Sequence, residues 1–242
     1  MTEQVPNLKI VLGELPERVI VCGDPNRAAR IAALLQNAKK IAENREYHSY
    51  AGYWNGVEVA IVSHGVGAPG AAVCFEELAK AGAKTIIRVG TAGSYQKEVI
   101  PGSLVISSSS VRRDGLTSQL VPDGFPAVAD RKVTENLART AAAASTGLPV
   151  HEGMTLTLDA FYPGVIEFPH QPYKKAGVVA VEMENSALFV IASLRGIRSG
   201  AILSIDGYAD ADFHEEYNPH TDSVAQAVES SARIALDAIC AE

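Results

Sequence analysis

The chain has 242 residues, of which 47% are hydrophobic and 20% charged, and its mean hydropathy is +0.07. These values exclude a disordered protein and predict a globular one with a substantial core. The formal net charge is −7, from 21 Lys plus Arg against 28 Asp plus Glu, which argues against nucleic-acid and anionic-membrane partners. Any anionic ligand must therefore be bound by a few local donors.

The cysteine pattern and the N-terminus indicate a cytoplasmic protein. Cys22, Cys74 and Cys240 form no C-x-x-C pair, are odd in number and have apolar neighbours, as expected for reduced, buried thiols without a metal. The first 16 residues lack the basic and apolar regions of a signal peptide, and no apolar run reaches the length of a membrane span.

Short β-branched runs alternate with helical patterns along the whole chain. The predicted strands are Arg18–Cys22, Val57–Ser63, Thr85–Val89, Ser103–Ser109, Met154–Leu158, Val178–Glu182 and Gly200–Ile205. The predicted helices are Pro25–Leu35, Pro69–Ala81, Val133–Ser145, Asn185–Arg195 and Asp222–Ala241. Asp24 followed by Pro25 is a typical helix start, and Gly82 and Gly147 stand where glycines end helices.

This alternation predicts an α/β fold with a largely parallel sheet. No linker, repeat or low-complexity tract interrupts the sequence, so a single domain over residues 1–242 is expected. The polar, acidic segment from Asp206 to Thr221 has no periodicity. It is either a loop near a functional site or a solvated surface loop.

The segment from Gly65 to Gly70 matches G-x-G-x-x-G between a strand and a helix. As a dinucleotide site it would need an acidic residue in the following strand, Thr85–Val89, which carries Arg88 instead, and Pro69 removes one backbone donor. A tight turn with close backbone packing is the favoured interpretation. An NADP-dependent oxidoreductase remains the alternative.

Two arginines point to a phosphate site at the carboxyl ends of the strands, where open α/β sheets bind ligands. Gly23 permits close approach to a ligand, and Arg27 lies in the first turn of a helix whose N-terminus attracts anions. Arg88 interrupts an apolar strand, and Thr91 adds a hydroxyl beside it. A buried Arg–Glu pair is the alternative for Arg88.

Three acidic residues close neighbouring strands. Glu182 and Glu184 could accept hydrogen bonds from sugar hydroxyls, act as the acid and base of a hydrolase, or pair with Arg88. Asp206 ends another strand, where partial burial would raise its pKa and suit a proton donor. A turn-capping role before Gly207 is the alternative for Asp206.

Taken together, these motifs resemble the nucleoside phosphorylase-I family, which comprises hexameric purine nucleoside phosphorylases, uridine phosphorylases and nucleosidases. The resemblance extends from about Lys9 to the C-terminal helix. It is carried, in order, by the motifs GDPNR (23–27), NREY (44–47), SHGVG (63–67), RVGTAG (88–93) and VEME (181–184). It implies a single phosphorylase-like domain with a mixed, barrel-like central sheet flanked by helices.

The resemblance also implies roles for individual residues. The phosphate site would comprise Gly23, Arg27, Arg88, Thr91 and, from a neighbouring subunit, Arg45. The ribose site would comprise Glu182, Met183, Glu184 and, in place of a histidine that many members have, Asn7. The base would contact Leu156, Tyr162 and Asp206, with Asp206 as the catalytic acid at N7.

The base itself is read from two positions. The uridine branch shares Asp159-x-Phe161-Tyr162-Pro163-Gly164 but then has a Gln and an Arg that bind uracil, where this chain has Val165 and Glu167. Together with Asp206, this difference favours a purine. No Arg follows Asp206 before Arg233, although many purine enzymes place one there to assist protonation.

The resemblance therefore implies a purine nucleoside phosphorylase acting in purine salvage. Its substrates are a nucleoside and inorganic phosphate, without a metal or redox cofactor. A homohexamer built as a trimer of dimers with shared active sites is expected. The alternatives are a uridine phosphorylase, a phosphate-independent nucleosidase and a non-catalytic nucleoside-binding protein.

Overall fold

The computed structural model describes residues 3–209 and 220–241, and one sheet of ten strands runs through them. The strands are β1 (Arg18–Cys22), β2 (Gln36–Asn44), β3 (Tyr47–Trp54), β4 (Val57–Ser63), β5 (Thr85–Ser94), β6 (Leu104–Arg113), β7 (Ala127–Val128), β8 (Val150–Leu158), β9 (Ala180–Glu182) and β10 (Arg198–Tyr208). The helices are α1 (Pro25–Ala32), α2 (Ala68–Ala81), α3 (Thr117–Leu120), α4 (Arg131–Ala143), α5 (His170–Lys175), α6 (Asn185–Arg195) and α8 (Asp222–Cys240).

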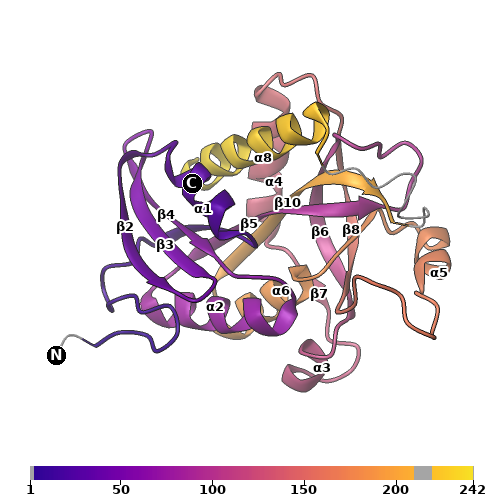
Figure 1. Ribbon diagram of the computed structural model, residues 1–242, viewed down its shortest axis with the longest axis horizontal. Coiled ribbons are helices and arrows are strands. Elements are labelled where there is room, and N and C mark those ends of the chain that lie inside the picture. Colours follow the sequence, from indigo (N-terminus) through magenta and orange to yellow (C-terminus); the bar gives the residue numbers. More distant parts are fainter. Residues whose placement is uncertain (1–2, 210–219, 242) are drawn as a thin grey trace.

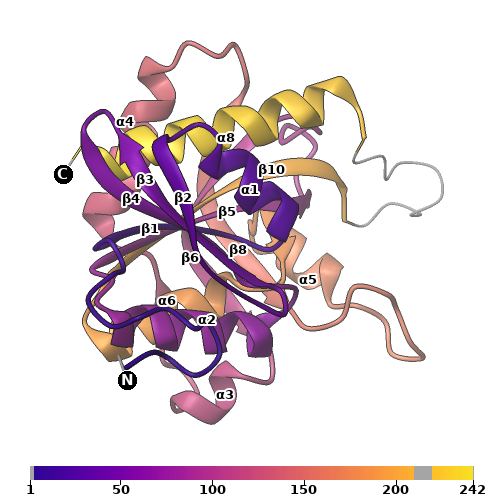
Figure 2. The same ribbon diagram turned by 60° about the vertical axis from the view of Figure 1, so that its left-hand side comes forward.

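Helices cover the sheet on two sides. Figures 1 and 2 show α4 and α8 along one side and α2 and α6 along the other. β1 explains why both sides are apolar. Its residues Val19 and Val21 join the core under α2 and α6, whereas Ile20 and Cys22 join the core under α1, α4 and α8. A strand that is buried on both faces is a continuous run of apolar residues in the sequence, and this run predicts β1.

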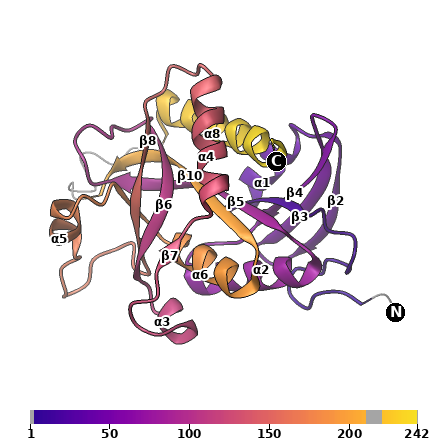
Figure 3. The same cartoon turned by 180° about the vertical axis from the view of Figure 1, so that it is seen from behind.

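Five strands close into a barrel. The order β10–β6–β8–β9–β5 is completed by direct pairing of β10 with β5, and Figure 3 shows β6, β8 and β10 around this part of the molecule. The expected mixed, barrel-like sheet flanked by helices is therefore confirmed. The largely parallel sheet inferred from alternation alone is corrected, because β10–β6, β5–β9 and the β2–β3–β4 ladder are antiparallel.

The β2–β3 hairpin is absent from the sequence-based prediction. Its first strand is exposed almost throughout, so it has no apolar periodicity that the sequence could reveal. The hairpin follows α1, which ends at Ala32 rather than at the predicted Leu35. Arg45 lies at the hairpin turn with φ 53°, the left-handed conformation that such tight turns require.

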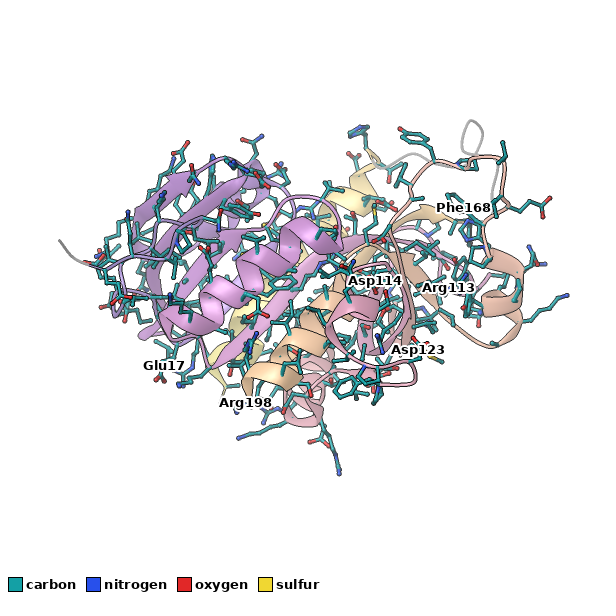
Figure 4. All side chains as sticks on the ribbon, turned by 90° about the horizontal axis from the view of Figure 1, so that it is seen from below. Glu17, Arg113, Asp114, Asp123, Phe168 and Arg198 are labelled. Atoms are coloured by element: carbon teal, nitrogen blue, oxygen red, sulfur yellow. The ribbon has the colours of Figure 1, made fainter. Side chains whose placement is uncertain are left out.

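The parallel strands β1, β5 and β10 all end on one side of the molecule. Figure 4 labels Glu17 and Arg198, at the amino ends of β1 and β10, and Phe168, which lies at the opposite end. The loops that follow the carboxyl ends of these strands meet there, and they build the site described next. Within the described residues, no helix combines the length and the apolar character needed to cross a membrane.

Candidate active site

A cavity of about 700 Å³ opens at the carboxyl ends of β1, β5 and β10. Its walls include almost all the residues predicted for phosphate, ribose and proton transfer: Gly23, Arg27, Arg88, Thr91, Glu182, Met183, Glu184 and Asp206. β10 pairs with one edge of β5 along Thr85–Ser94, whereas β1 and β9 pair with the beginning and the end of its other edge. The two arginines of the cavity come from α1 and β5, and its aromatic residues come from the segment after β8 and from the end of β10.

Arg27 enters the cavity from the first turn of α1. Asp24 caps this helix, because its carboxylate accepts hydrogen bonds from the backbone N–H groups of Asn26 and Arg27 at 2.9 and 3.2 Å. These two N–H groups are therefore already used, and the idea that the helix N-terminus itself holds the anion is corrected. The buried Nε of Arg27 has no partner among the described residues, so the guanidinium is the group available to an anion.

Arg88 is both buried and paired. Its Nη1 donates to Asn185 Oδ1 at 2.9 Å and lies 3.1 Å from Glu182 Oε2, and its Nη2 donates to Glu184 Oε2. Its Nε is buried without a partner in the described part of the chain. The alternative for Arg88, a buried Arg–Glu pair, is therefore present in the structure, and the role of Arg88 as a phosphate donor stays a prediction. A Cβ on Gly90 would lie 2.7 Å from Nη1 of Arg88, so Gly90 leaves space for the guanidinium.

The two glutamates have different tasks. Glu182 accepts hydrogen bonds from Thr157 Oγ1 and from the N–H groups of Glu184 and Asn185, at 2.5, 2.6 and 2.8 Å. It therefore shapes the start of α6 more than it offers oxygens to a ligand. Glu184 is bound by Arg88 and by the backbone N–H of Gly67 at 2.6 Å.

The G-x-G-x-x-G turn thus supplies backbone to the site rather than a dinucleotide cradle. Gly65 and Gly67 adopt φ 77° and 90°, a region that side chains disfavour. The Gly67 N–H can then face Glu184.

The ionisation of the two glutamates follows from the same contacts. Burial raises the pKa of Glu182, and Arg88 only partly offsets this rise. Burial also acts to raise the pKa of Glu184, but Arg88, His64 and the Gly67 N–H outweigh it and lower that pKa below its usual value. Glu184 is therefore an anion, with acceptor capacity for hydroxyl groups.

His64 lies behind these groups as a buried, neutral side chain. Burial lowers its pKa to about 4, and its Nδ1 is 2.8 Å from the carbonyl oxygen of Gly65. Its Nε2 has no partner among the described residues. The ring packs edge-on against Phe75, which makes His64 part of the wall that supports the Gly65–Gly67 turn.

Asp206 is presented by a β-bulge. β10 pairs with β5 in register up to Ile205 opposite Ala92, and the pairing resumes with Gly207 opposite Gly93. Asp206 is the extra residue, and such bulges redirect a side chain from the regular alternation. Its side chain lines the cavity and is only 8% exposed. Of the acidic loop predicted after it, residues 210–219 lie outside the described residues.

Aromatic and apolar residues form the remaining wall: Leu158, Phe161, Phe168, His170 and Tyr208. Two predicted base contacts are not among them. Leu156 is fully buried in the core beneath, and Tyr162 is 77% exposed and does not line the cavity. Leu158, two residues further along β8, faces the cavity in place of Leu156. Sequence reasoning missed His170, Phe168 and Asn185, because no local pattern marks them.

Comparisons with known proteins agree with this geometry. A family model described as "Phosphorylase superfamily" matches residues 17–240. The chain belongs to this superfamily. It is 37% identical over 248 residues to a purine nucleoside phosphorylase of Plasmodium falciparum, covering 100% of this chain and 98% of the other. It is also 37% identical over 205 residues to a uridine phosphorylase of Thermococcus kodakarensis, covering 80% and 73% of the two chains.

A solved structure shows the same fold over nearly the whole chain. The purine nucleoside phosphorylase of Toxoplasma gondii in complex with immucillin-H superimposes with a TM-score of 0.94 at 30% identity, covering 99% of this chain and 96% of that one. The resemblance to nucleoside phosphorylases is thereby confirmed. The protein is an enzyme of the pentosyltransferase type, and its substrates are a nucleoside and phosphate.

Two residues that the family resemblance places in the site of this phosphorylase lie away from the chain's own cavity. Asn7 binds Glu77, with its backbone N–H and its side-chain amide both donating to that carboxylate at 2.6–3.0 Å. Arg45, at the β2–β3 turn, is also not among the residues that line the cavity, whereas its neighbour Glu46 is. Neither residue therefore contributes to the site of its own subunit.

Proposed function

We propose that this enzyme catalyses the reversible phosphorolysis of purine nucleosides and deoxynucleosides, releasing the free base and (deoxy)ribose 1-phosphate. One observation carries the proposal. A single cavity contains the guanidinium groups of Arg27 and Arg88, whose buried Nε atoms have no partner in the described part of the chain, and the carboxyl group of Asp206, which a bulge turns inward. The two guanidinium groups can bind a phosphate, and the carboxyl group can protonate a leaving base.

The reaction transfers the sugar from nitrogen to oxygen. A phosphate oxygen held by Arg27, Arg88 and Thr91 attacks C1′ as the bond from C1′ to N9 breaks, and the phosphate dianion stabilises the positive charge that develops on the sugar. Glu184 accepts hydrogen bonds from the ribose hydroxyls, and Met183 packs beside the ring. The proton of Asp206 passes to N7, so the base leaves neutral. These groups and inorganic phosphate supply every charge that the step needs, so no metal or redox cofactor is required.

The preference for purine rests on the base end of the cavity. The uracil-reading Gln and Arg are replaced by Val165 and Glu167, and Asp206 gives a purine N7 its proton donor. Purine and uridine phosphorylases both occur among the relatives. Uridine phosphorolysis is therefore the second candidate.

We further propose a dimer with shared sites, arranged in a hexamer as three such dimers. Arg45 does not line the cavity of its own subunit, although Glu46 in the same turn does, and a neighbouring subunit is the place where this guanidinium can meet a phosphate. Asn7 is proposed to approach the neighbouring ribose in the same way. Cys22, Cys74 and Cys240 are free thiols, which supports a location in the reducing cytoplasm. We propose that the enzyme acts there in purine salvage.

The decisive experiment is cleavage of inosine with and without inorganic phosphate, with chromatographic identification of the sugar product. The proposal expects ribose 1-phosphate and hypoxanthine, and no turnover when phosphate is removed. Free ribose formed without phosphate would instead indicate a nucleosidase. Turnover of uridine with none of inosine would indicate a uridine phosphorylase. Tight binding of inosine without any turnover would indicate a non-catalytic binding protein.

A further inference from the structure

Tyr95 and His170 form a hydrogen-bonded pair at the edge of the cavity. The Tyr95 hydroxyl lies 2.7 Å from Nδ1 of His170, and the two ring centroids are 5.4 Å apart. Tyr95 follows the end of β5 and is only 1% exposed. His170 is the first residue of α5, is partly exposed and lines the cavity. A buried phenol thus holds a histidine whose ring borders the ligand space.

The rest of α5 is tied to the same strand end. Gln96, next to Tyr95, donates its side-chain amide to the carbonyl oxygens of Lys174 and Val178 at 3.2 and 2.7 Å. The backbone N–H of Tyr95 also donates to Val179 at 3.0 Å. The position of His170 is therefore set by several contacts to the rigid end of β5, as a residue that reads a ligand requires.

The surroundings of His170 suit a flat heteroaromatic ring. The Phe168 ring centroid is 5.0 Å from that of His170, and Phe161 and Tyr208 line the same cavity. Figure 4 shows Phe168 in the loop near α5. Aromatic walls bind planar bases by stacking, while a few polar groups determine which base fits. Among the described residues, His170 and Asp206 supply such polar groups in this part of the lining.

We propose that His170 contacts the purine base at its C6 substituent, and that Tyr95 is a positioning residue that makes His170 a donor. This inference rests on the proposed function. A neutral imidazole has one donor and one acceptor nitrogen, and the hydrogen bond at one of them decides the other. In the tautomer that we propose, the Tyr95 O–H donates to Nδ1 across the 2.7 Å contact and the ring proton is on Nε2. An Nε2–H donor matches the C6 oxygen of inosine or guanosine and opposes the C6 amino group of adenosine.

The test compares inosine and adenosine as substrates of the wild-type enzyme and three variants. His170→Phe keeps a ring but removes both nitrogens, and Tyr95→Phe removes only the orienting hydroxyl. Tyr173→Phe is the control, because it deletes a hydroxyl from the same helix at a residue outside the cavity lining. The readouts are kcat/KM for each nucleoside, KM for phosphate, and the thermal unfolding midpoint.

Wild-type enzyme is expected to prefer inosine. His170→Phe should lower the inosine-to-adenosine ratio of kcat/KM by about three- to tenfold, the effect of one hydrogen bond between neutral groups. Tyr95→Phe should lower this ratio by a smaller factor, Tyr173→Phe should leave it unchanged, and the KM for phosphate should stay the same throughout.

Three results would overturn the inference: a wild-type preference for adenosine, a ratio within twofold of wild type in both His170→Phe and Tyr95→Phe, or an equal loss on both nucleosides with a higher KM for phosphate. The third would show that the pair only supports the cavity. If the wild-type enzyme cleaves no purine nucleoside, both the proposed function and this inference are wrong. If the wild-type enzyme cleaves inosine but the inosine-to-adenosine ratio is unchanged in the His170 and Tyr95 variants, only this inference is wrong.

Discussion

The guanidinium of Arg88 donates a hydrogen bond to the carboxylate of Glu184, which lies 96 residues further along the chain. Arg88 belongs to β5, and Glu184 precedes the first residue of α6. The contact therefore links β5, which carries the proposed phosphate ligands Arg88 and Thr91, with Glu184, the proposed ribose ligand. In the proposed reaction, phosphate and nucleoside would meet at this contact. The pair keeps both charges compensated inside the protein before either substrate arrives.

Removing the cation of this network, Arg88, should lower the free energy of unfolding much more than neutralising one of its anions, Glu184. Arg88→Ala leaves the carboxylates of Glu182 and Glu184 buried without their cation, and such a loss costs about 3–5 kcal/mol. Glu184→Gln should cost less, because Arg88 keeps Glu182 and Asn185. Urea denaturation of both variants measures the difference. Equal losses, or a loss under about 1 kcal/mol for Arg88→Ala, would contradict a buried ionic network.

Asp206→Asn should act on the leaving base. We expect inosine turnover to fall by about 10²–10⁴-fold, the usual contribution of a general acid. A purine nucleoside already methylated at N7 carries the positive charge that the proton would supply, and its turnover should fall far less. Steady-state kinetics on the two substrates gives the comparison. A similar loss on both would mean that Asp206 does not act by protonating N7.

The tight space over Gly90 predicts a specific defect in phosphate binding. In Gly90→Ala the new methyl group would meet the Arg88 guanidinium at 2.7–2.9 Å, so the guanidinium must move although two glutamates hold it. KM for phosphate should rise by about tenfold or more, as expected when a charge-assisted hydrogen bond is disturbed. Gly164→Ala is the matched control, since a Cβ there has no atom within 4 Å and the residue is not in the left-handed region. An unchanged KM for phosphate in Gly90→Ala would show that Arg88 can shift freely.

Shared active sites can be tested by mixing two inactive variants. If the sites are shared as proposed, Arg45→Ala should damage the site of the neighbour, whereas Asp206→Asn should damage the site of its own subunit. A mixed dimer would therefore contain one intact site, and co-refolded subunits should recover inosine turnover that neither variant shows alone. Mass spectrometry of the mixture verifies that subunits have exchanged. Exchange without recovery would mean that Arg45 serves its own subunit or none.

His64 should make the folded protein sensitive to acid. Its pKa is about 4 in the folded protein because the ring is buried, against about 6.5 in an unfolded chain. Between these values the unfolded state binds a proton that the folded state does not, so stability is full above about pH 6.5 and falls as the pH drops toward 4. The loss reaches roughly 3 kcal/mol at the lower end.

Unfolding free energies measured from pH 7 to pH 4 would reveal this term as a slope. His64→Asn retains an amide donor for the Gly65 carbonyl oxygen but does not titrate, so its slope should be shallower than that of the wild type. The comparison concerns the slopes, because the absolute stability of the variant also reflects changed packing against Phe75. Parallel slopes would assign the acid sensitivity to other groups.

The sequence by itself determined the elements with a strong local signal. β1 and β4 have the predicted bounds, and α6 spans Asn185–Arg195 as expected. A buried strand or an apolar helix is a run of apolar residues that are consecutive in the sequence, so it can be recognised locally. The Asp24 cap was likewise readable from one dipeptide. Short motifs at strand ends also gave the arginines, Glu184 and Asp206 that line the cavity, since parallel strands gather their carboxyl ends at one edge.

Tertiary structure decided what depends on contacts between distant segments. The closure of β10 onto β5, the exposed hairpin that carries Arg45, and the pairing of Tyr95 with His170 across 75 residues have no local signature. The same is true of the choice between Leu156 and Leu158, which share one face of β8 and differ in their distance from the strand end, where the cavity lies. The composition shows only that the chain is acidic. Folding brings Arg27 and Arg88 of that chain into one cavity and pairs Arg88 with the buried carboxylate of Glu184, because compensation of buried charge depends on neighbours in space and not on neighbours in sequence.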